Sequence, residues 1–146
     1  MAIDQKFINQ FASVTSKAAV ASYKLVGKKD KIAADKAAVD SMRNELNKLN
    51  VDGKIVIGEG ELDEAPMLYI GEKVGTTRGP KIDIAVDPLE GTNFAANNLP
   101  GALSVIAIAE KDNLFHAPET YMEKISSKVN ERGVIDLDHT VKENIF

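Results

Sequence analysis

The sequence predicts an α+β fold in which two N-terminal helices are followed by a mainly antiparallel sheet. In the first third of the chain, apolar residues recur at spacings of three and four, which is typical of one helical face. Short runs rich in β-branched and apolar residues follow, and these are typical of buried strands. A length of 146 residues is enough for one domain with its own core, so we expect a single domain over residues 1–146.

Both helices are predicted from their apolar spacing and from the residues at their ends. We expect the first helix over residues 4–26, with Gly27 as a suitable end. Its apolar face consists of Ile3, Phe7, Phe11, Val14, Ala18, Ser22 and Leu25. The second helix follows the polar connector 28–31, and Asp52-Gly53 is expected to turn the chain after it. Its apolar face consists of Ala34, Ala38, Met42, Leu46 and Leu49.

Three strands are predicted in the middle of the chain. The first is the run 54–57, the second is 82–86, and the third is the apolar stretch 102–109. Between the first two strands, we expect Pro66 to open a short helix through Glu72, followed by a loop over 75–80.

The last third of the chain carries weaker signals. The polar turn 111–113 leads into the apolar residues at 114–116, which predicts a hairpin. Residues 133–137 read as an extended segment, and Thr140 is a suitable N-cap for a short final helix. We find no internal repeat and no linker in the sequence.

Composition excludes several classes of function. The 18 basic and 22 acidic residues give a net charge of −4, and no long basic block is present to bind a nucleic-acid backbone. The absence of cysteine excludes thiolate metal sites, and the apolar run at 105–109 is far shorter than a membrane span. The N-terminus lacks the pattern of a secretory signal, so we expect a cytoplasmic protein with no nucleic-acid or membrane partner.

The most informative stretch is the six-residue string from Asp87 to Thr92, which follows the predicted second strand. Asp87 and Glu90 place two carboxylates at a turn that Pro88 stiffens, since proline fixes φ. Two carboxylates about 4 Å apart repel by about 4 kcal/mol at an effective dielectric constant near 20, so such a pair needs a cation or a shared proton. If Gly91-Thr92 open a helix, their amides add an anion site, and all-oxygen ligands favour Mg²⁺ or Mn²⁺. The alternative is an acidic turn with no ligand.

Three other groups are weaker candidates when taken alone. Four carboxylates follow the first predicted strand, at Glu59, Glu61, Asp63 and Glu64, and they form either a solvated loop or a second wall of the site. Lys31 and Asp35 share one helical face, where a surface salt bridge is the simpler interpretation. Tyr121 either packs its ring in a core or presents its hydroxyl to a sugar.

Together these segments resemble class II fructose-1,6-bisphosphatases. The matching segments are Asp30-Lys31, Ala34-Asp35, 56–75, 87–92, 117–124 and 135–137. The glutamate-rich stretch 56–75 is specific to that family, whereas 87–92 alone indicates only the wider lithium-sensitive phosphatase superfamily, which includes inositol monophosphatases. Members of the family are longer, so we expect the chain to correspond to their N-terminal part, with the C-terminal half absent.

The resemblance implies a layered sandwich of helices and sheets and assigns roles to the candidate residues. It implies metal ligation by Asp35, Glu59, Asp87 and Glu90, with Mn²⁺ or Mg²⁺ as the cofactor. It implies that Glu90, Gly91 and Thr92 hold the scissile phosphate and that Tyr121 contacts the sugar. It also implies that Lys31 and Asp63 support the site, and that Thr92 and Glu59 or Asp63 orient the attacking water.

The function expected from this resemblance is metal-dependent hydrolysis of the 1-phosphate of fructose 1,6-bisphosphate, giving fructose 6-phosphate and phosphate. Such an enzyme would act in gluconeogenesis or a Calvin-type cycle on a small sugar bisphosphate, and we expect it to form a homo-oligomer. One alternative is a phosphatase for sedoheptulose 1,7-bisphosphate or an inositol-type phosphate. An alternative of another class is a non-catalytic module for cation binding or assembly, which predicts an exposed apolar face.

Overall fold

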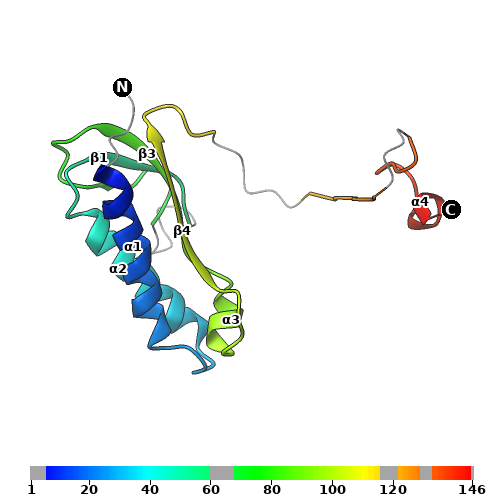
Figure 1. Cartoon of the computed structure of the whole chain (residues 1–146), viewed down its shortest axis with the longest axis horizontal. Coiled ribbons are helices and arrows are strands. Elements are labelled where there is room, and N and C mark those ends of the chain that lie inside the picture. Colours follow the sequence, from blue (N-terminus) through cyan, green and yellow to red (C-terminus); the bar gives the residue numbers. More distant parts are fainter. Residues whose placement is uncertain (1–5, 60–67, 116–121, 129–132, 146) are drawn as a thin grey trace. The chain divides into compact units, whose positions relative to one another are not determined.

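A computed structural model describes residues 6–59, 68–115, 122–128 and 133–145 of the chain (Figure 1). The chain divides into two compact units, 1–116 and 117–146, and each is described by itself. The α+β prediction is confirmed in the first unit, where two long helices pack on a four-stranded sheet. The expectation of one domain over 1–146 stays a prediction. Among the described helices, none combines the length and the apolar character that crossing a bilayer requires.

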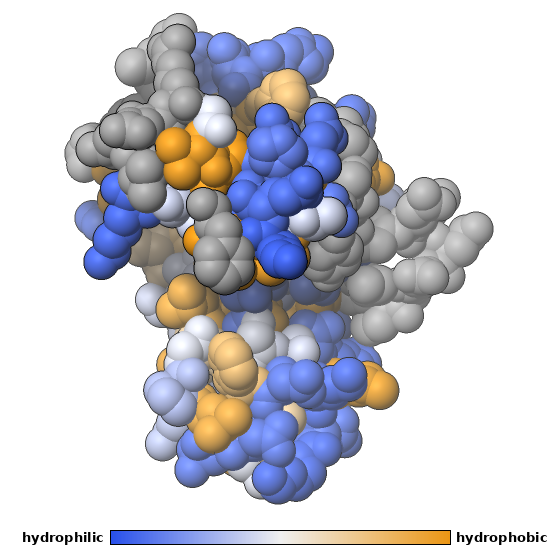
Figure 2. Space-filling view, turned by 90° about the vertical axis from the view of Figure 1, so that its right-hand side faces the viewer, coloured by the Kyte–Doolittle hydropathy of each residue, from blue (hydrophilic) through white to orange (hydrophobic). Residues whose placement is uncertain are grey.

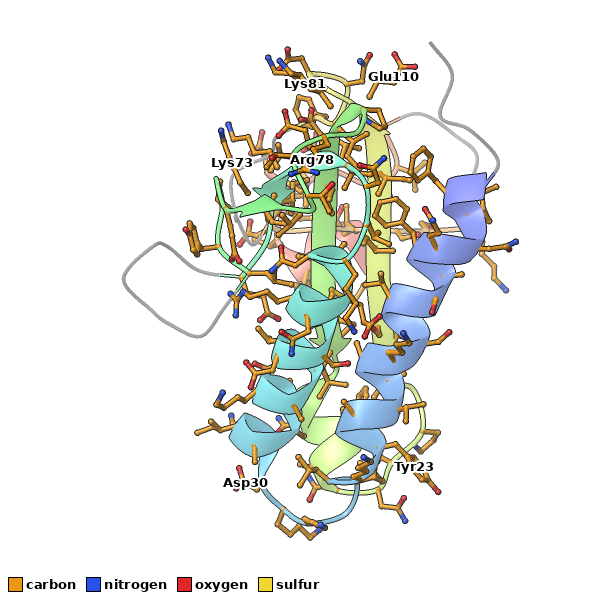
Figure 3. All side chains as sticks on the ribbon, turned by 90° about the vertical axis from the view of Figure 1, so that its left-hand side faces the viewer. Tyr23, Asp30, Lys73, Arg78, Lys81 and Glu110 are labelled. Carbon is orange, nitrogen blue, oxygen red and sulfur yellow. The ribbon has the colours of Figure 1, made fainter. Side chains whose placement is uncertain are left out.

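Both predicted N-terminal helices are present, as α1 (Lys6–Tyr23) and α2 (Lys31–Leu46). Each ends about three residues earlier than predicted. Helix α2 begins where the side chain of Asp30 accepts a hydrogen bond from the backbone N–H of Ala33, at 2.9 Å. Tyr23 and Asp30 lie at the same end of the helix pair, so the two neighbouring helices are antiparallel (Figure 3).

The sheet has the strand order β2-β1-β3-β4. Its strands are β1 (Asp52–Ile57), β2 (Lys73–Val74), β3 (Lys81–Glu90) and β4 (Leu103–Glu110). Strands β1 and β3 are parallel, and the other two pairings are antiparallel, so the sheet is mixed. The three predicted strands are confirmed as β1, β3 and β4, and β3 runs four residues further than predicted. The central strand β3 therefore carries the acidic motif up to Glu90.

The predicted turn at Asp52-Gly53 is wrong, because these two residues begin β1. The chain turns earlier, over residues 47–51. Gly53 is buried and pairs with both neighbouring strands, opposite Val74 and Ile82. A Cβ atom at Gly53 would lie 2.9 Å from the Cδ1 atom of Ile84. Glycine therefore serves close packing here, not a turn.

The predicted helix from Pro66 to Glu72 is wrong in its described part, residues 68–72, which contains turns and no helix. The backbone of this segment pairs with β1 instead. The N–H of Ile55 donates to the carbonyl of Glu72 at 2.9 Å, and the N–H of Gly71 donates to the carbonyl of Ile55 at 2.8 Å. These hydrogen bonds take the groups that a helix would need.

The predicted hairpin after β4 is wrong as far as the described residues 111–115 extend, because none of them is in a strand. The buried carboxylate of Asp83 accepts a hydrogen bond from the N–H of Asp112 at 2.6 Å, which fixes the turn in a different way. Asp112 also has a φ of 65°, in the left-handed region, which interrupts an extended path.

The second unit contains one described helix, α4 (Val141–Ile145). Its predicted cap is confirmed, since the N–H of Glu143 donates to Oγ1 of Thr140 at 3.3 Å and the N–H of Thr140 donates to Oε2 of Glu143 at 2.9 Å. The predicted extended segment at 133–137 forms no strand. Its backbone hydrogen bonds go to the side chain of Asn144, which joins both the N–H and the carbonyl of Asp136.

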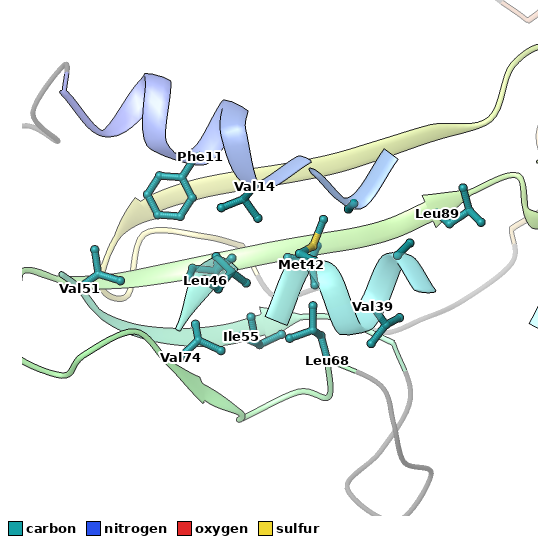
Figure 4. Close-up of a cluster of buried hydrophobic side chains, with 14 of the residues drawn as sticks. Phe11, Val14, Val39, Met42, Leu46, Val51, Ile55, Leu68, Val74 and Leu89 are labelled. Carbon is teal, nitrogen blue, oxygen red and sulfur yellow. The ribbon is translucent and has the colours of Figure 1, made fainter. Parts of the chain in front are cut away.

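The core of the first unit lies between the helix pair and one face of the sheet (Figure 4). Its fully buried members include Val14, Val39, Met42, Leu46, Val51, Ile55 and Ile84. The space-filling view shows hydrophobic residues at the surface among hydrophilic ones (Figure 2). The exposed apolar residues of β4 and the segment before it are Phe94, Leu99, Leu103 and Val105, which are between 44% and 60% exposed.

Candidate metal and phosphate site

A β-bulge at the end of β3 brings the two carboxylates of the acidic motif to one face of the sheet. Asp87 pairs with Val105 and Glu90 pairs with Leu103, so three steps along β3 match two steps along β4. In a regular strand, residues three apart point to opposite faces. The extra residue changes this alternation, so Asp87 and Glu90 share a face. Pro88 lies inside the bulge, where its missing N–H costs no ladder hydrogen bond.

A second irregularity lies at the end of β1, two residues before Glu59. Ile55 pairs with Ile84, but Ile57 pairs with Ala85, so β1 also contains one extra residue. Glu59 follows the end of β1, and its backbone N–H donates to the carbonyl of Leu68 at 3.0 Å. Glu59 is half-buried, and its Oε2 atom is buried.

The carboxyl group of Asp87 lies close to that of Glu90. Burial, hydrogen bonding toward the Glu90 side chain and the charge of Glu90 together raise the pKa of Asp87 from 3.8 to about 6, although the Leu89 amide opposes them. The charge of Asp35 raises this pKa further, which places the N-terminal half of α2 within electrostatic reach. Two other predicted carboxylates thus act on Asp87 and favour its protonated form.

Asp35 is half-buried on α2, and burial raises its pKa. Its Oδ1 atom is buried and has no hydrogen-bond partner among the described residues. Lys31 is the first residue of α2 and is exposed. The surface salt bridge considered for Lys31 and Asp35 does not form in the described part of the chain. Asp35 therefore has an unused buried acceptor.

The condition set for the acidic motif, a helix opening at Gly91-Thr92, is met by the short helix α3 (Thr92–Ala96). Gly91 is its N-cap, with a φ of 78° in the left-handed region, and Thr92 is its first residue. No side chain caps this helix, so the first amides are not used by a capping group. Helix α3 is fixed to the connection between α1 and α2, because Gly27 and Lys29 donate backbone hydrogen bonds to Ala95 and Ala96 at 3.0 and 2.9 Å.

These donors fit a hard divalent cation. The buried oxygen of Asp35, which has no partner among the described residues, and the neighbouring carboxyl groups of Asp87 and Glu90 would both be stabilised by a positive charge, and all are oxygen ligands. In the described parts of the chain, no three acidic or imidazole side chains converge closely enough to hold a metal ion as they stand. Metal ligation by Asp35, Glu59, Asp87 and Glu90 therefore stays a prediction. Asp63 and Tyr121, the other predicted site residues, lie outside the described residues.

One polar pair near this site was missed by the sequence analysis. Arg43 of α2 donates from Nε to Oε1 of Glu72 at 2.7 Å and from Nη2 to Oε2 at 3.0 Å. The hydrogen bond to Glu72 raises the pKa of Arg43 above its usual value. The position of this arginine next to the apolar Met42 was a signal for a polar pair at the edge of the core. Its partner could not be found, because that depends on the fold of residues 68–72, which were wrongly predicted to be helical.

The raised pKa of Asp87 predicts how pH changes the stability of the metal-free chain. A carboxyl group whose pKa is about 6 in the folded state binds its proton more tightly there than in the unfolded state. Its contribution to the free energy of unfolding is therefore fully present below about pH 3.8 and is lost as the pH rises through 6. We expect Asp87→Asn to make the midpoint of thermal unfolding less dependent on pH between 4 and 7. Asp52→Asn, at the other end of the sheet, is the control. An unchanged pH dependence in Asp87→Asn would contradict the raised pKa of Asp87.

Comparison with known proteins places the chain in a family. A family model described as "Bacterial fructose-1,6-bisphosphatase, glpX-encoded" matches residues 5–146. The chain is 53% identical over 136 residues, or 93% of its length, to a fructose-1,6-bisphosphatase 1 class 2 of Escherichia coli. It is 48% identical over 143 residues, or 98% of its length, to a D-fructose 1,6-bisphosphatase class 2/sedoheptulose 1,7-bisphosphatase of a Synechococcus strain. It spans 40% and 43% of the lengths of these two relatives.

Among solved structures, an extragenic suppressor from Pyrococcus furiosus aligns with a TM-score of 0.48 and 19% identity, over 75% of this chain and 42% of that chain. This likeness is too low to carry an argument. The family match covers nearly the whole chain and includes the segments on which the site is built. The chain therefore belongs to the glpX-encoded family of bacterial fructose-1,6-bisphosphatases.

Proposed function

We propose that this chain takes part in metal-dependent hydrolysis of the 1-phosphate of fructose 1,6-bisphosphate, giving fructose 6-phosphate and phosphate. The observation that carries the proposal is the Asp87 carboxyl group of raised pKa, which the bulge in β3 places next to Glu90, within reach of the charge of Asp35 and directly before α3. The names of the relatives support the sugar bisphosphate. Because some relatives are also named for sedoheptulose 1,7-bisphosphate, that sugar is the second substrate to test.

We propose Asp35, Glu59, Asp87 and Glu90 as the groups that hold Mn²⁺ or Mg²⁺. A bound divalent cation would supply positive charge to the phosphate oxygens and lower the pKa of water. Asp87 would release its proton on binding, since a cation and a proton compete for the same oxygens. This competition would link the raised pKa of Asp87 to metal binding.

The remaining residues would bind the substrate and move protons. The N–H groups of Gly91 and Thr92 would donate to the phosphate oxygens, next to Glu90. Thr92 would orient a water molecule in line with the bond to the sugar oxygen, and Glu59 or Asp63 would accept its proton. The new oxygen–phosphorus bond forms as the bond to the sugar oxygen breaks, and that oxygen leaves with a proton. In this proposal Tyr121 contacts the sugar, and Lys31 supports the anionic groups.

The first test measures phosphate release from fructose 1,6-bisphosphate by the 146-residue chain, with Mn²⁺ and with EDTA, together with Mn²⁺ binding. We expect release only with Mn²⁺, and we expect Glu59→Ala to lower kcat/KM by about 100-fold or more, which is typical of a lost general base. Asp112→Asn, an exposed carboxylate on the turn after β4, is the control and should keep full activity.

Two results would contradict parts of this proposal. Equal release by Glu59→Ala and the unaltered chain would remove Glu59 from the site. Absence of both Mn²⁺ binding and phosphate release would contradict the proposed site as a whole. Binding of Mn²⁺ without release would favour a second candidate function.

That second candidate is a non-catalytic module that binds cations or assembles with another subunit. The exposed apolar residues of β4 and the segment before it favour it, because contiguous exposed apolar surface marks interaction sites. Leu103 and Val105 are two residues apart, and therefore point to the same face of β4. An assembly of this kind is also compatible with the homo-oligomer expected from the sequence.

The assembly candidate predicts self-association through β4. We expect light scattering to give a mass above that of the monomer, increasing with concentration. We expect the double variant Leu103→Ser/Val105→Ser to shift the mass toward the monomer, because it removes exposed apolar area. Val20→Ser on the exposed face of α1 is the control. A monodisperse monomer at all concentrations would rule this candidate out.

A further inference from the structure

Arg43 and Glu72 form a two-point ion pair between the middle of α2 and the segment 68–72. The two hydrogen bonds are 2.7 and 3.0 Å long, and the side chains are 24% and 11% exposed. The other ion pairs among the described residues all involve a lysine that is more than half exposed. A planar guanidinium on a carboxylate fixes both distance and orientation, which a single lysine contact does not.

The segment held by Arg43 in turn holds the end of β1. The backbone N–H of Glu59 donates to the carbonyl of Leu68 at 3.0 Å, and Leu68 is fully buried. The two backbones are in close contact here, since a Cβ atom at Gly58 would lie 2.2 Å from the Leu68 carbonyl oxygen. The backbone at Glu59 therefore moves only together with Leu68.

Glu72 is connected to this segment by its own hydrogen bonds. Its backbone N–H donates to the carbonyl of Tyr69 at 3.0 Å, and its Oε2 atom accepts from the N–H of Tyr69 at 3.3 Å. Its carbonyl accepts from Ile55 of β1 at 2.9 Å. A change in the position of the Glu72 carboxylate would therefore also shift the turn that contains Tyr69 and the paired backbone of β1.

The other end of the ion pair lies on the helix that carries Asp35. Arg43 follows Asp35 by eight residues, or about 12 Å of helix, and both belong to the single element α2. The ion pair thus joins one element that carries a proposed ligand, Asp35, to the segment that positions another, Glu59. We propose that Arg43 is a positioning residue which, through Glu72, fixes the separation of Asp35 and Glu59 and so sets the affinity of the site for a divalent cation.

The proposal rests on the proposed function, because it assumes that Asp35 and Glu59 bind the cation. The packing of α2 on the sheet does not require the ion pair, because Met42 and Leu46 already supply fully buried apolar contacts there. Replacing a buried ion pair by apolar residues of similar size is often neutral for stability. Such a replacement would then change the geometry of the site and leave the stability of the chain unchanged.

The test uses the double variant Arg43→Met/Glu72→Leu of the 146-residue chain, which removes both members of the pair. Mn²⁺ binding is followed by the loss of the free-ion EPR signal. We expect the dissociation constant to rise about 10- to 100-fold, as is typical when residues that orient metal ligands are changed. The control is Lys17→Met/Glu45→Leu, which removes the ion pair of 2.6 Å between Lys17 of α1 and Glu45 of α2, and with it the contact of Glu45 with Lys48. It should change the constant less than about twofold.

A second readout needs no metal. Hydrogen exchange of the Glu59 amide should become faster in Arg43→Met/Glu72→Leu and stay unchanged in the control, because that amide is bonded to Leu68. Thermal unfolding of each variant checks that the chain is folded.

Two results would overturn the positioning role. In the first, Arg43→Met/Glu72→Leu matches the unaltered chain in both Mn²⁺ binding and exchange of the Glu59 amide, while Asp87→Asn still weakens Mn²⁺ binding. The metal site would then be retained, and the positioning role of Arg43 would be rejected. The second is the absence of Mn²⁺ binding by the unaltered chain, in which case the proposed site fails and the positioning role fails with it.

Discussion

The site depends on one constraint in β3, namely that a regular strand cannot place residues three apart on the same face. The bulge between Asp87 and Glu90 removes this constraint, and β1 has an irregularity of its own between Ile55 and Ile57. Both occur near the C-terminal ends of the two parallel strands, where α3 also begins. The core on the helix side of the sheet keeps these strands in register, because Ile55 and Ile84 are fully buried opposite each other.

The electrostatics of the site follow from that geometry. Once Asp87 and Glu90 share a face, they cannot both be ionised at low cost, and the pKa of Asp87 is raised to about 6. Asp35 adds a further negative charge and keeps one buried oxygen without a partner in the described part of the chain. Such an arrangement opposes folding at neutral pH in the absence of a counter-charge. A cation that replaces the proton would remove this cost, which links stability and binding at the same atoms.

The sequence was sufficient for those parts of the structure that depend on local pattern. The helices, the three main strands, the start of α3 at Thr92 and the cap at Thr140 follow from spacing and capping chemistry. The errors at Asp52-Gly53 and at residues 68–72 arose where pairing with a distant strand decided the conformation. Local propensity does not contain that information.

Of the candidate site, as of the fold, only the parts that lie close together in the sequence or belong to a known family pattern were recognisable. Asp87, Glu90 and Gly91 were recognisable because they lie in one string, and the resemblance to a family added Asp35. The Arg43–Glu72 pair was not predictable, because its partners are 29 residues apart and meet only after the segment at 68–72 has paired with β1. The two bulges were also invisible in the sequence, since an extra residue is defined only against a partner strand.

The central proposal is that Asp35, Asp87 and Glu90 come together around a bound divalent cation, and anomalous diffraction tests it directly. Crystals of the chain grown with Mn²⁺ would be measured near the manganese absorption edge. We expect an anomalous peak within bonding distance of oxygen atoms of Asp87 and Glu90 and close to Asp35, at the end of β3. Manganese bound only elsewhere on the chain would contradict the proposal.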